Sequence, residues 1–282
     1  MDSWRKNYAL PVSLKPCVSS LTVMVIFSLV IPVFPTTFVF NEFNGTNLIL
    51  EAGATLIPSR SAVALTNHTH WVIGRALYST PVQMKSNGTL SSFSTTFVFS
   101  MVNPHLDAGG HGIAFFIAPN TTLMAGLASE YIGLVNGTNN GQAYNHLFAV
   151  EFDTTRSVEL GDPNDNHVGV DINSLISVKT ANAGYWNAEE FQGINLQCGS
   201  NIQAWIDYDS LQSQVNVTIT LAGLPRPQKP LISQKIDLQN VLQENMFVGF
   251  SAATGNLVED HYVLAWSFTT EGTASPLDIS RL

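Results

Sequence analysis

Polar and apolar residues alternate over short stretches of this chain, and that pattern predicts β-strands. Residues 214–221 (QVNVTITL) alternate at every position, so Asn216 is predicted to face outward. The inward residues are Val215, Val217, Ile219 and Leu221. Further β-rich runs, separated by Gly, Asn, Asp and Pro, are 94–100, 112–118, 148–153, 167–172, 202–208, 246–251 and 262–269. Only 238–243 favours a short helix, so the pattern predicts an all-β antiparallel β-sandwich of the jelly-roll type.

The N-terminal 37 residues follow a different pattern. Three basic residues precede an apolar run over 18–34, which is typical of a secretory signal peptide cleaved near 34–37. An uncleaved signal anchor is the alternative interpretation. We predict three parts: a signal peptide at 1–37, one folded domain at 38–272 and a C-terminal tail at 273–282. This organisation predicts a secreted or extracellular protein.

Composition narrows the function. The chain has 282 residues, of which 45% are hydrophobic and 12% charged, so it can bury a large core. Its net charge of −9 and the absence of a Lys/Arg cluster in the body argue against nucleic acid as a partner. Cys17 falls within the signal segment, so Cys198 is alone and is expected to be a small buried hydrophobe. Sequons that indicate glycosylation lie at Asn44, Asn67, Asn87, Asn120, Asn136 and Asn216.

Two acidic residues interrupt the apolar run 148–153. Glu151 and Asp153 are two positions apart, so in a strand they project from the same face. Two carboxylates on one face of an apolar strand need a compensating charge. Asp162 and His167 follow closely. A histidine with carboxylates suits Mn²⁺, and carboxylates with backbone carbonyls suit Ca²⁺, so the set predicts a site for divalent ions.

These motifs resemble the metal-binding signature of legume-type (L-type) lectins. The matching residues are 150–154 (VEFDT), Asp162 and 167–174 (HVGVDINS); the resemblance continues at 38–45, 111–119 (HGIAFFIAP) and 266–268. The details at 131–134, 139–141 and 276–280 are most similar to the extracellular domain of plant lectin-domain receptor kinases. No glycine-rich ATP loop, H-R-D or D-F-G is present, so we expect a free apoplastic lectin-like protein or the ectodomain of a plasma-membrane receptor.

The resemblance implies a concanavalin-like lectin fold with structural Mn²⁺ and Ca²⁺ ions. It places Mn²⁺ among Glu151, Asp153, Asp162 and His167, with Ser177 near the ion through water. It places Ca²⁺ against Asp153, Asp162, the carbonyl of Thr155 and Ser157. In this family the ions do no chemistry; they hold the loops of a sugar pocket. The implied partner is a glycan or cell-wall carbohydrate. Family members often form a homodimer through the back sheet, so that assembly is expected on the resemblance alone.

The implied sugar pocket departs from the family pattern. The family's sugar-holding Asp is His111 here, its Asn is Ser157, and its Gly falls at Ser129 or Glu130. An Asp accepts two or more hydrogen bonds from hydroxyls, whereas a neutral His accepts one. Each unmatched buried group costs about 1–3 kcal/mol, so the pocket is predicted to be altered. The loop 253–261 resembles the family's specificity loop and adds Asn256, Leu257 and Val258. The resemblance also predicts a cis peptide bond between Gly110 and His111.

Three functions follow from these observations. The first is carbohydrate binding through the altered pocket. The second is recognition of a protein or small apolar ligand, with a vestigial sugar site. The third, glycoside hydrolysis, is disfavoured because related enzymes carry a second catalytic Glu after Glu151-Phe152-Asp153, where this chain has 154–156 (TTR). We therefore predict that the chain is not an enzyme.

Overall fold

The computed structural model of the chain describes residue 1 and residues 35–45, 47–103, 109–122 and 126–282. The predicted signal peptide lies almost entirely outside the described residues. The chain divides into two units, Met1–Val33 and Phe34–Leu282, and the second contains the folded domain. None of the helices in the described part is long and apolar enough to cross a membrane.

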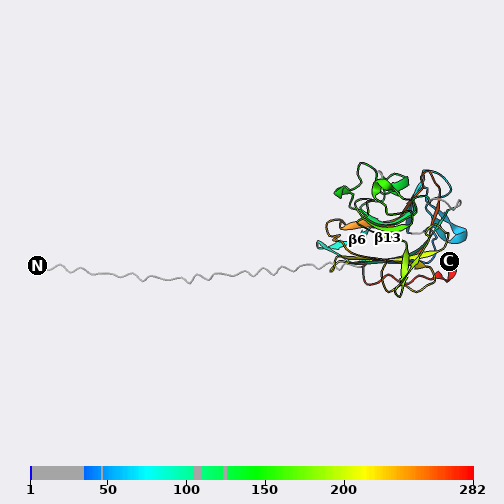
Figure 1. Cartoon of the computed structure of the whole chain (residues 1–282). Helices are drawn as coiled ribbons and strands as arrows, with labels where there is room; N and C mark the ends of the chain where they lie inside the picture. Colours follow the sequence, from blue (N-terminus) through cyan, green and yellow to red (C-terminus); the bar gives the residue numbers. More distant parts are fainter. Residues whose placement is uncertain (2–34, 46, 104–108, 123–125) are drawn as a thin grey trace. The chain divides into compact units, whose positions relative to one another are not determined.

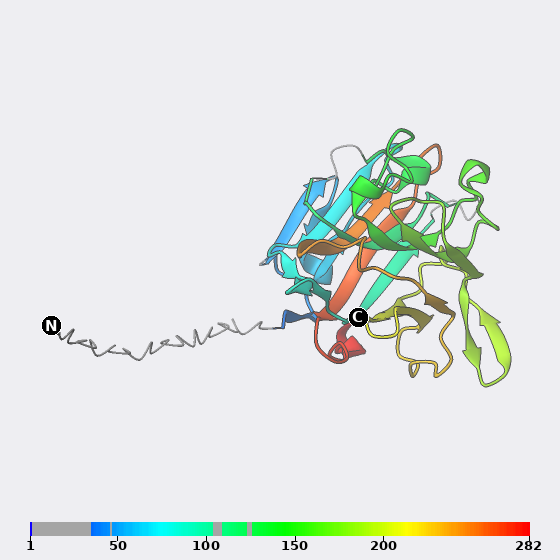
Figure 2. The same ribbon diagram turned by 90° about the vertical axis from the view of Figure 1, so that its left-hand side faces the viewer.

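Two antiparallel sheets form this unit, stacked as layers (Figure 1), and Figure 2 shows strands lying side by side. In the back sheet the order is β18 (Ile232–Lys235), β17 (Gln214–Leu221), β16 (Ile202–Asp209), β9 (Phe93–Val102), β20 (Asp260–Thr269), β4 (Ala62–Ala64) and β3 (Thr55–Ile57), with β1 (Thr37–Phe40) also paired to β20. The strand order in the front sheet is β13 (Lys179–Asn182), β12 (His167–Ile172), β11 (Phe148–Asp153), β10 (Ile113–Ala118), β19 (Asn245–Ala253), β5 (Ile73–Tyr78) and β2 (Leu48–Ala52). The short strand β6 (Val82–Gln83) also pairs with β19.

Short elements complete the unit. Two hairpins are formed by β7 (Lys85–Ser86) with β8 (Thr89–Leu90), and by β14 (Gly184–Asn187) with β15 (Glu190–Gly193). The helical turns are η1 (Pro58–Arg60), η2 (Ser129–Tyr131), η3 (Ala143–Asn145), η4 (Val158–Leu160) and η5 (Ile279–Arg281). The predicted all-β sandwich is therefore confirmed.

The main core fills the space between the sheets, and the alternation along each strand supplies its residues. On β17, Val215, Val217 and Ile219 enter this core, while Asn216 lies on the opposite face as predicted. Leu221 was predicted to face inward, which is wrong: it ends the strand and is 38% exposed. Aromatic rings carry contacts across the core; for example, Phe250 on β19 meets Trp266 on β20 edge to face at 4.9 Å.

The front sheet is buried on both faces. On β10, Ile113, Phe115 and Ile117 join the main core, while Ala114, Phe116 and Ala118 pack into a second cluster on the other face. That second cluster includes Leu134, Val135, Leu147, Leu160 and Leu175, which come from the long connections around β11 and β12. Loops therefore cover the outer face of this sheet. A polar side chain of β11 or β12 that points to this face is shielded from water and lies in surroundings of low dielectric constant.

Two local expectations are wrong. The segment 238–243 forms turns rather than a helix: the amides of Val241 and Leu242 both bond to the Leu238 carbonyl, and no regular helix follows. Its apolar side chains, Leu238, Val241 and Leu242, pack into the main core. Cys198 is exposed, because the chain leaves the sandwich there after a single bridge to Val102.

Candidate functional site

A cluster of acidic residues with one histidine lies on the loop-covered face of the front sheet. Glu151 projects from β11, His167 begins β12, and Asp162 comes from the connection between them. Their ligand atoms lie within 4.8 Å of one another, and all three residues are buried. His167 Nε2 is 3.5 Å from Glu151 Oε1 and 3.9 Å from Asp162 Oδ1.

Strand register explains why these residues meet. In the β11–β12 pair, Asp153 lies opposite His167 and Glu151 opposite Gly169. The inward neighbours on both strands are Val or Phe, so alternation sends the polar residues outward. Gly169 has a specific role: a Cβ at this position would overlap the Glu151 carboxylate and the Ser177 hydroxyl. Glycine thus leaves room for the acid on the facing strand.

Asp171 belongs to this cluster and was missed in the sequence. Ser177 Oγ lies 2.7 Å from Asp171 Oδ1 and 2.9 Å from Glu151 Oε1. A hydroxyl donates one proton, so only one of these contacts is a hydrogen bond to an ionised carboxylate unless the other acid is protonated. The signal was available: positions 167, 169 and 171 share one face of a strand.

The electrostatics of the cluster favour a cation. Burial and then the charge of Glu151 raise the pKa of both Asp153 and Asp171 well above the usual value. Burial opposes charge on His167, but the Glu151 and Asp162 carboxylates outweigh it and raise its pKa. His167 Nε2 and Asp171 Oδ2 are buried without a hydrogen-bond partner. Buried acceptors that lack partners, beside carboxylates that repel one another, fit a divalent ion.

The residues predicted for Ca²⁺ lie beside the cluster and stabilise its loop. The Asp153 carboxylate is outside the group of three and accepts the Thr155 amide at 2.5 Å. The Asp162 carboxylate accepts the Ser157 amide at 2.6 Å. Thr155 Oγ1 donates to the Gly109 carbonyl at 2.5 Å and accepts the His111 amide at 3.2 Å. The loop 154–166 between β11 and β12, which we call the ion loop because the predicted ion ligands surround it, is therefore bonded directly to the segment that carries His111.

His111 is enclosed at the predicted sugar pocket. Its Nε2 is 3.0 Å from Ser129 Oγ, and a Cβ on Gly255 would overlap the imidazole. Burial lowers the pKa of His111 to about 4, so the ring is neutral near pH 7. The two alternatives for the family's Gly, Ser129 and Glu130, both lie half-buried in η2, and Ser129 is the one whose side chain contacts His111 by a hydrogen bond. Asn256 is exposed, Leu257 is half-buried and Val258 is buried.

The predicted cis bond before His111 is wrong, since the described residues contain no cis peptide. The chain turns instead through positive φ angles of 75° at His111 and 88° at Gly112. The Gly110 amide donates to Glu259 Oε2 at 3.1 Å, which holds this turn with its trans bond.

A buried network under the pocket was also missed. Glu259 Oε2 accepts from Thr154 Oγ1 at 2.7 Å and lies 3.1 Å from His261 Nε2. Burial alone would raise the pKa of Glu259, but its hydrogen bonds lower it, so the carboxylate stays charged. The network ties the loop 253–261 to the ion loop and to Gly110. Nothing in strand periodicity predicts such a link, because it joins residues more than 100 positions apart.

Trp71 is an exposed aromatic residue beside the same loop. It is 58% exposed and has φ of 59°, a conformation that is strained for a bulky residue. Neighbouring bonds hold it there: the Val72 amide donates to Thr254 Oγ1 at 2.9 Å, and His70 Nδ1 is 3.3 Å from the Gly255 carbonyl. Trp71 therefore stands next to the residues that enclose His111.

A two-sheet sandwich with a buried acid and histidine cluster on its loop-covered face has the architecture of a lectin-type domain. The model of the legume lectin domain matches residues 35–282, and the chain belongs to that family. The L-type lectin-domain containing receptor kinase IV.1 of Arabidopsis thaliana is 44% identical over 245 residues, 86% of this chain and 36% of the relative. The chain thus spans about a third of the length of such relatives.

Solved lectins share the fold. The lectin UEA-II complexed with galactose has a TM-score of 0.70 at 30% identity, covering 83% of this chain and 98% of that one. Peanut lectin with a nine-residue peptide has a TM-score of 0.70 at 30% identity, covering 84% and 97%.

Proposed function

We propose that this chain is an extracellular carbohydrate-binding domain, without enzymatic activity, in which Mn²⁺ and Ca²⁺ hold the loops of an altered sugar pocket. The observation that carries the proposal is the bonded path from the ion loop through Thr155 to Gly109 and His111. An ion that orders the Thr155 loop orders the pocket as well. The solved relative with galactose supports a sugar as ligand.

The proposed ion ligands follow from donor chemistry. Glu151, Asp162 and His167, with Asp153, would hold Mn²⁺, and Ser177 and Asp171 lie beside them. Asp153 and Asp162, with Thr155 and Ser157, would hold Ca²⁺. The ions supply fixed positive charge and rigidity. The sugar would contact His111, Ser129, Ser157 and the loop with Asn256 and Leu257; Glu130 and Val258 lie beside this set.

A glycan array tests the proposal. The secreted domain is applied with Ca²⁺ and Mn²⁺ and again after chelation, and binding that disappears on chelation is the expected result. The proposal is contradicted if elemental analysis shows that the protein holds both ions and the same protein binds no glycan on the array.

Recognition of a peptide or small apolar ligand is the second candidate. The observation favouring it is the enclosed imidazole of His111, which occupies space between Ser129 and Gly255. Peanut lectin, a relative of the same fold, was solved with a nine-residue peptide. Titration of ion-loaded protein with a peptide library separates this candidate from the first.

Trp71→Ala is expected to weaken oligosaccharide binding roughly 5- to 30-fold, as removal of an exposed aromatic contact costs about 1–2 kcal/mol. Monosaccharide binding should change little, because the hydrogen bonds of His111 run to Thr155 and Ser129, whereas Trp71 is 58% exposed. Phe191→Ala is the control, since Phe191 is also exposed but lies on the hairpin β14–β15, which adjoins β17. Calorimetric titration measures both; equal losses for both ligands would place Trp71 within the primary pocket.

Secretion and glycosylation belong to the same proposal. The division into a signal peptide at 1–37, a domain at 38–272 and a tail at 273–282 stays a prediction. The beginning of the predicted tail contacts the domain, because the Ala274 amide donates to Ser94 on β9. Among the sequon asparagines, Asn44, Asn67, Asn87 and Asn120 are exposed, whereas Asn136 and Asn216 are half-buried. A homodimer through the back sheet also stays a prediction, which sedimentation analysis would check.

A further inference from the structure

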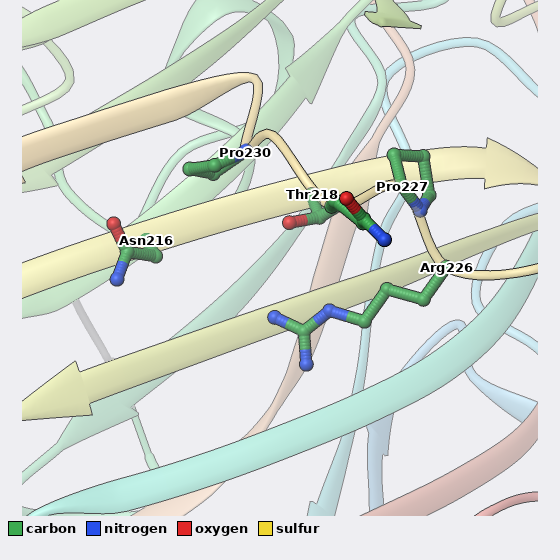
Figure 3. A pocket seen from close by; sticks show the side chains of 6 residues that line it. Asn216, Thr218, Arg226, Pro227 and Pro230 are labelled. Atoms are coloured by element: carbon green, nitrogen blue, oxygen red, sulfur yellow. The ribbon is translucent and has the colours of Figure 1, made fainter. Parts of the chain in front are cut away.

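A small cleft lies on the outer face of the back sheet, away from the front-sheet site. On β17, Asn216 and Thr218 lie on the face opposite the core residues Val215 and Val217; Asn216 is half-buried and Thr218 is buried. The connection from β17 to β18 folds back over them and completes a cleft of about 360 Å³. Its walls are Asn216, Thr218, Arg226, Pro227, Gln228 and Pro230 (Figure 3).

The walls combine polar groups with apolar ring faces. Asp207 on β16 lies opposite Asn216 in the register, and its carboxylate is paired with the Arg226 guanidinium. That guanidinium carries five N–H groups, so it has donors beyond the one used by Asp207. Pro227 and Pro230 present the apolar surfaces. A sugar ring has hydroxyl groups at its edge and C–H groups on its faces, which matches this arrangement.

We propose that the chain's own N-linked glycan on Asn216 fills this cleft, with its first N-acetylglucosamine against Pro227 and Pro230 and within donor reach of Arg226. The sequon is Asn216-Val217-Thr218, and both of its defining residues line the cleft. The volume lies in the range of small-molecule sites. The inference rests on the proposed passage through the secretory pathway. A dimer through the back sheet would have to leave room for this glycan.

Asn87 provides a matched contrast within the chain. It lies in the turn between β7 and β8, is exposed and has φ of 50°. A Cβ on the next residue, Gly88, would meet no atom within 4 Å. A glycan on Asn87 therefore extends into solvent, whereas one on Asn216 starts inside the cleft.

Enzymatic removal of glycans from the folded protein tests the contact directly. The chain is secreted from a eukaryotic cell and treated with an amidase that cleaves between asparagine and the first sugar. Mass spectrometry of glycopeptides follows each site. We expect release at Asn216 to be about tenfold slower than at Asn87 in the native protein, because the sugar must first leave the cleft, and equal after denaturation.

Equal native rates would overturn the proposal, and so would an unoccupied Asn216 beside an occupied Asn87. In both cases secretion and glycosylation would stand. If no sequon is occupied, the secretory proposal fails as well, so the two failures are distinguishable.

A mutant cycle tests the role of Arg226. Arg226→Ala removes its contact with Asp207 in every background, but it removes a sugar contact only when Asn216 is glycosylated. We expect the loss in Tm to be larger by about 2–4 °C in the glycosylated chain than in the Asn216→Gln chain. Asn87→Gln serves as the control background and should leave the Arg226 effect unchanged. An equal loss in all three backgrounds contradicts the proposed contact.

Discussion

Chelation of divalent cations is expected to lower the Tm of this domain by roughly 8–16 °C. A ligand at about a thousand times its Kd stabilises the folded state by about 4.1 kcal/mol, and each kcal/mol corresponds to about 2–4 °C in a domain of this size. The structural reason is the cluster of Glu151, Asp153, Asp162 and Asp171, which is buried and has one histidine as its counter-charge. Scanning calorimetry with added Ca²⁺ and Mn²⁺, and then with chelator, measures the shift.

The shift should depend on pH in a defined direction. In the cation-free protein the pKa values of Asp153 and Asp171 are raised above the usual 3.8. Their contribution to stability is therefore fully present below the unfolded-state pKa and is lost as pH rises through the folded-state pKa. These two groups thus stabilise the chelated protein progressively as pH falls through their raised folded-state pKa values. Cation binding needs ionised ligands and weakens over the same interval.

The difference in Tm between loaded and chelated protein is consequently largest near neutral pH and shrinks toward acid. Glu189→Gln, in the exposed turn of the hairpin β14–β15, is the control and should leave the difference unchanged. Glu151→Gln should reduce it strongly. A chelated protein with the Tm of the loaded one at neutral pH would show that the cluster does not hold a structural ion.

Sequence patterns predicted the strands of this domain well because each strand carries its own periodicity. The limits expected for 148–153, 167–172 and 214–221 coincide with β11, β12 and β17. The same alternation was enough to predict that Glu151 and Asp153 share a face. Pattern reasoning failed at 238–243 (LQNVLQ), where apolar residues at helix-like spacing instead pack into the core from a series of turns.

The candidate site was predicted only in part, because its remaining partners come from distant segments. Glu259 meets Thr154 and Gly110 across more than 100 positions, and Val72, the neighbour of Trp71, donates to Thr254 across 182 positions. Such contacts depend on sheet order, which a single sequence does not encode locally. The family pattern predicted a cis bond between Gly110 and His111, which is wrong; the bond is trans and the chain turns through positive φ angles at His111 and Gly112.

Restoring the family's acceptor and amide is expected to strengthen monosaccharide binding. The variant carries His111→Asp and Ser157→Asn, and galactose is the ligand to test because the solved relative binds it. An aspartate supplies two acceptor oxygens, and an asparagine supplies a carbonyl with an NH₂ group. At about 1–3 kcal/mol for each matched group, each substitution should raise affinity roughly 5- to 150-fold.

The local structure accommodates this change. Aspartate is smaller than histidine, so it leaves open space beside Gly255, and Ser129 Oγ remains near as a donor. His111→Ala is the matched control: it opens the same space and adds no acceptor. If alanine gained as much affinity as aspartate, the imidazole would block the pocket by volume alone. If neither variant bound galactose while retaining its ions, the pocket would be shaped for another ligand, and the peptide or apolar candidate would take precedence.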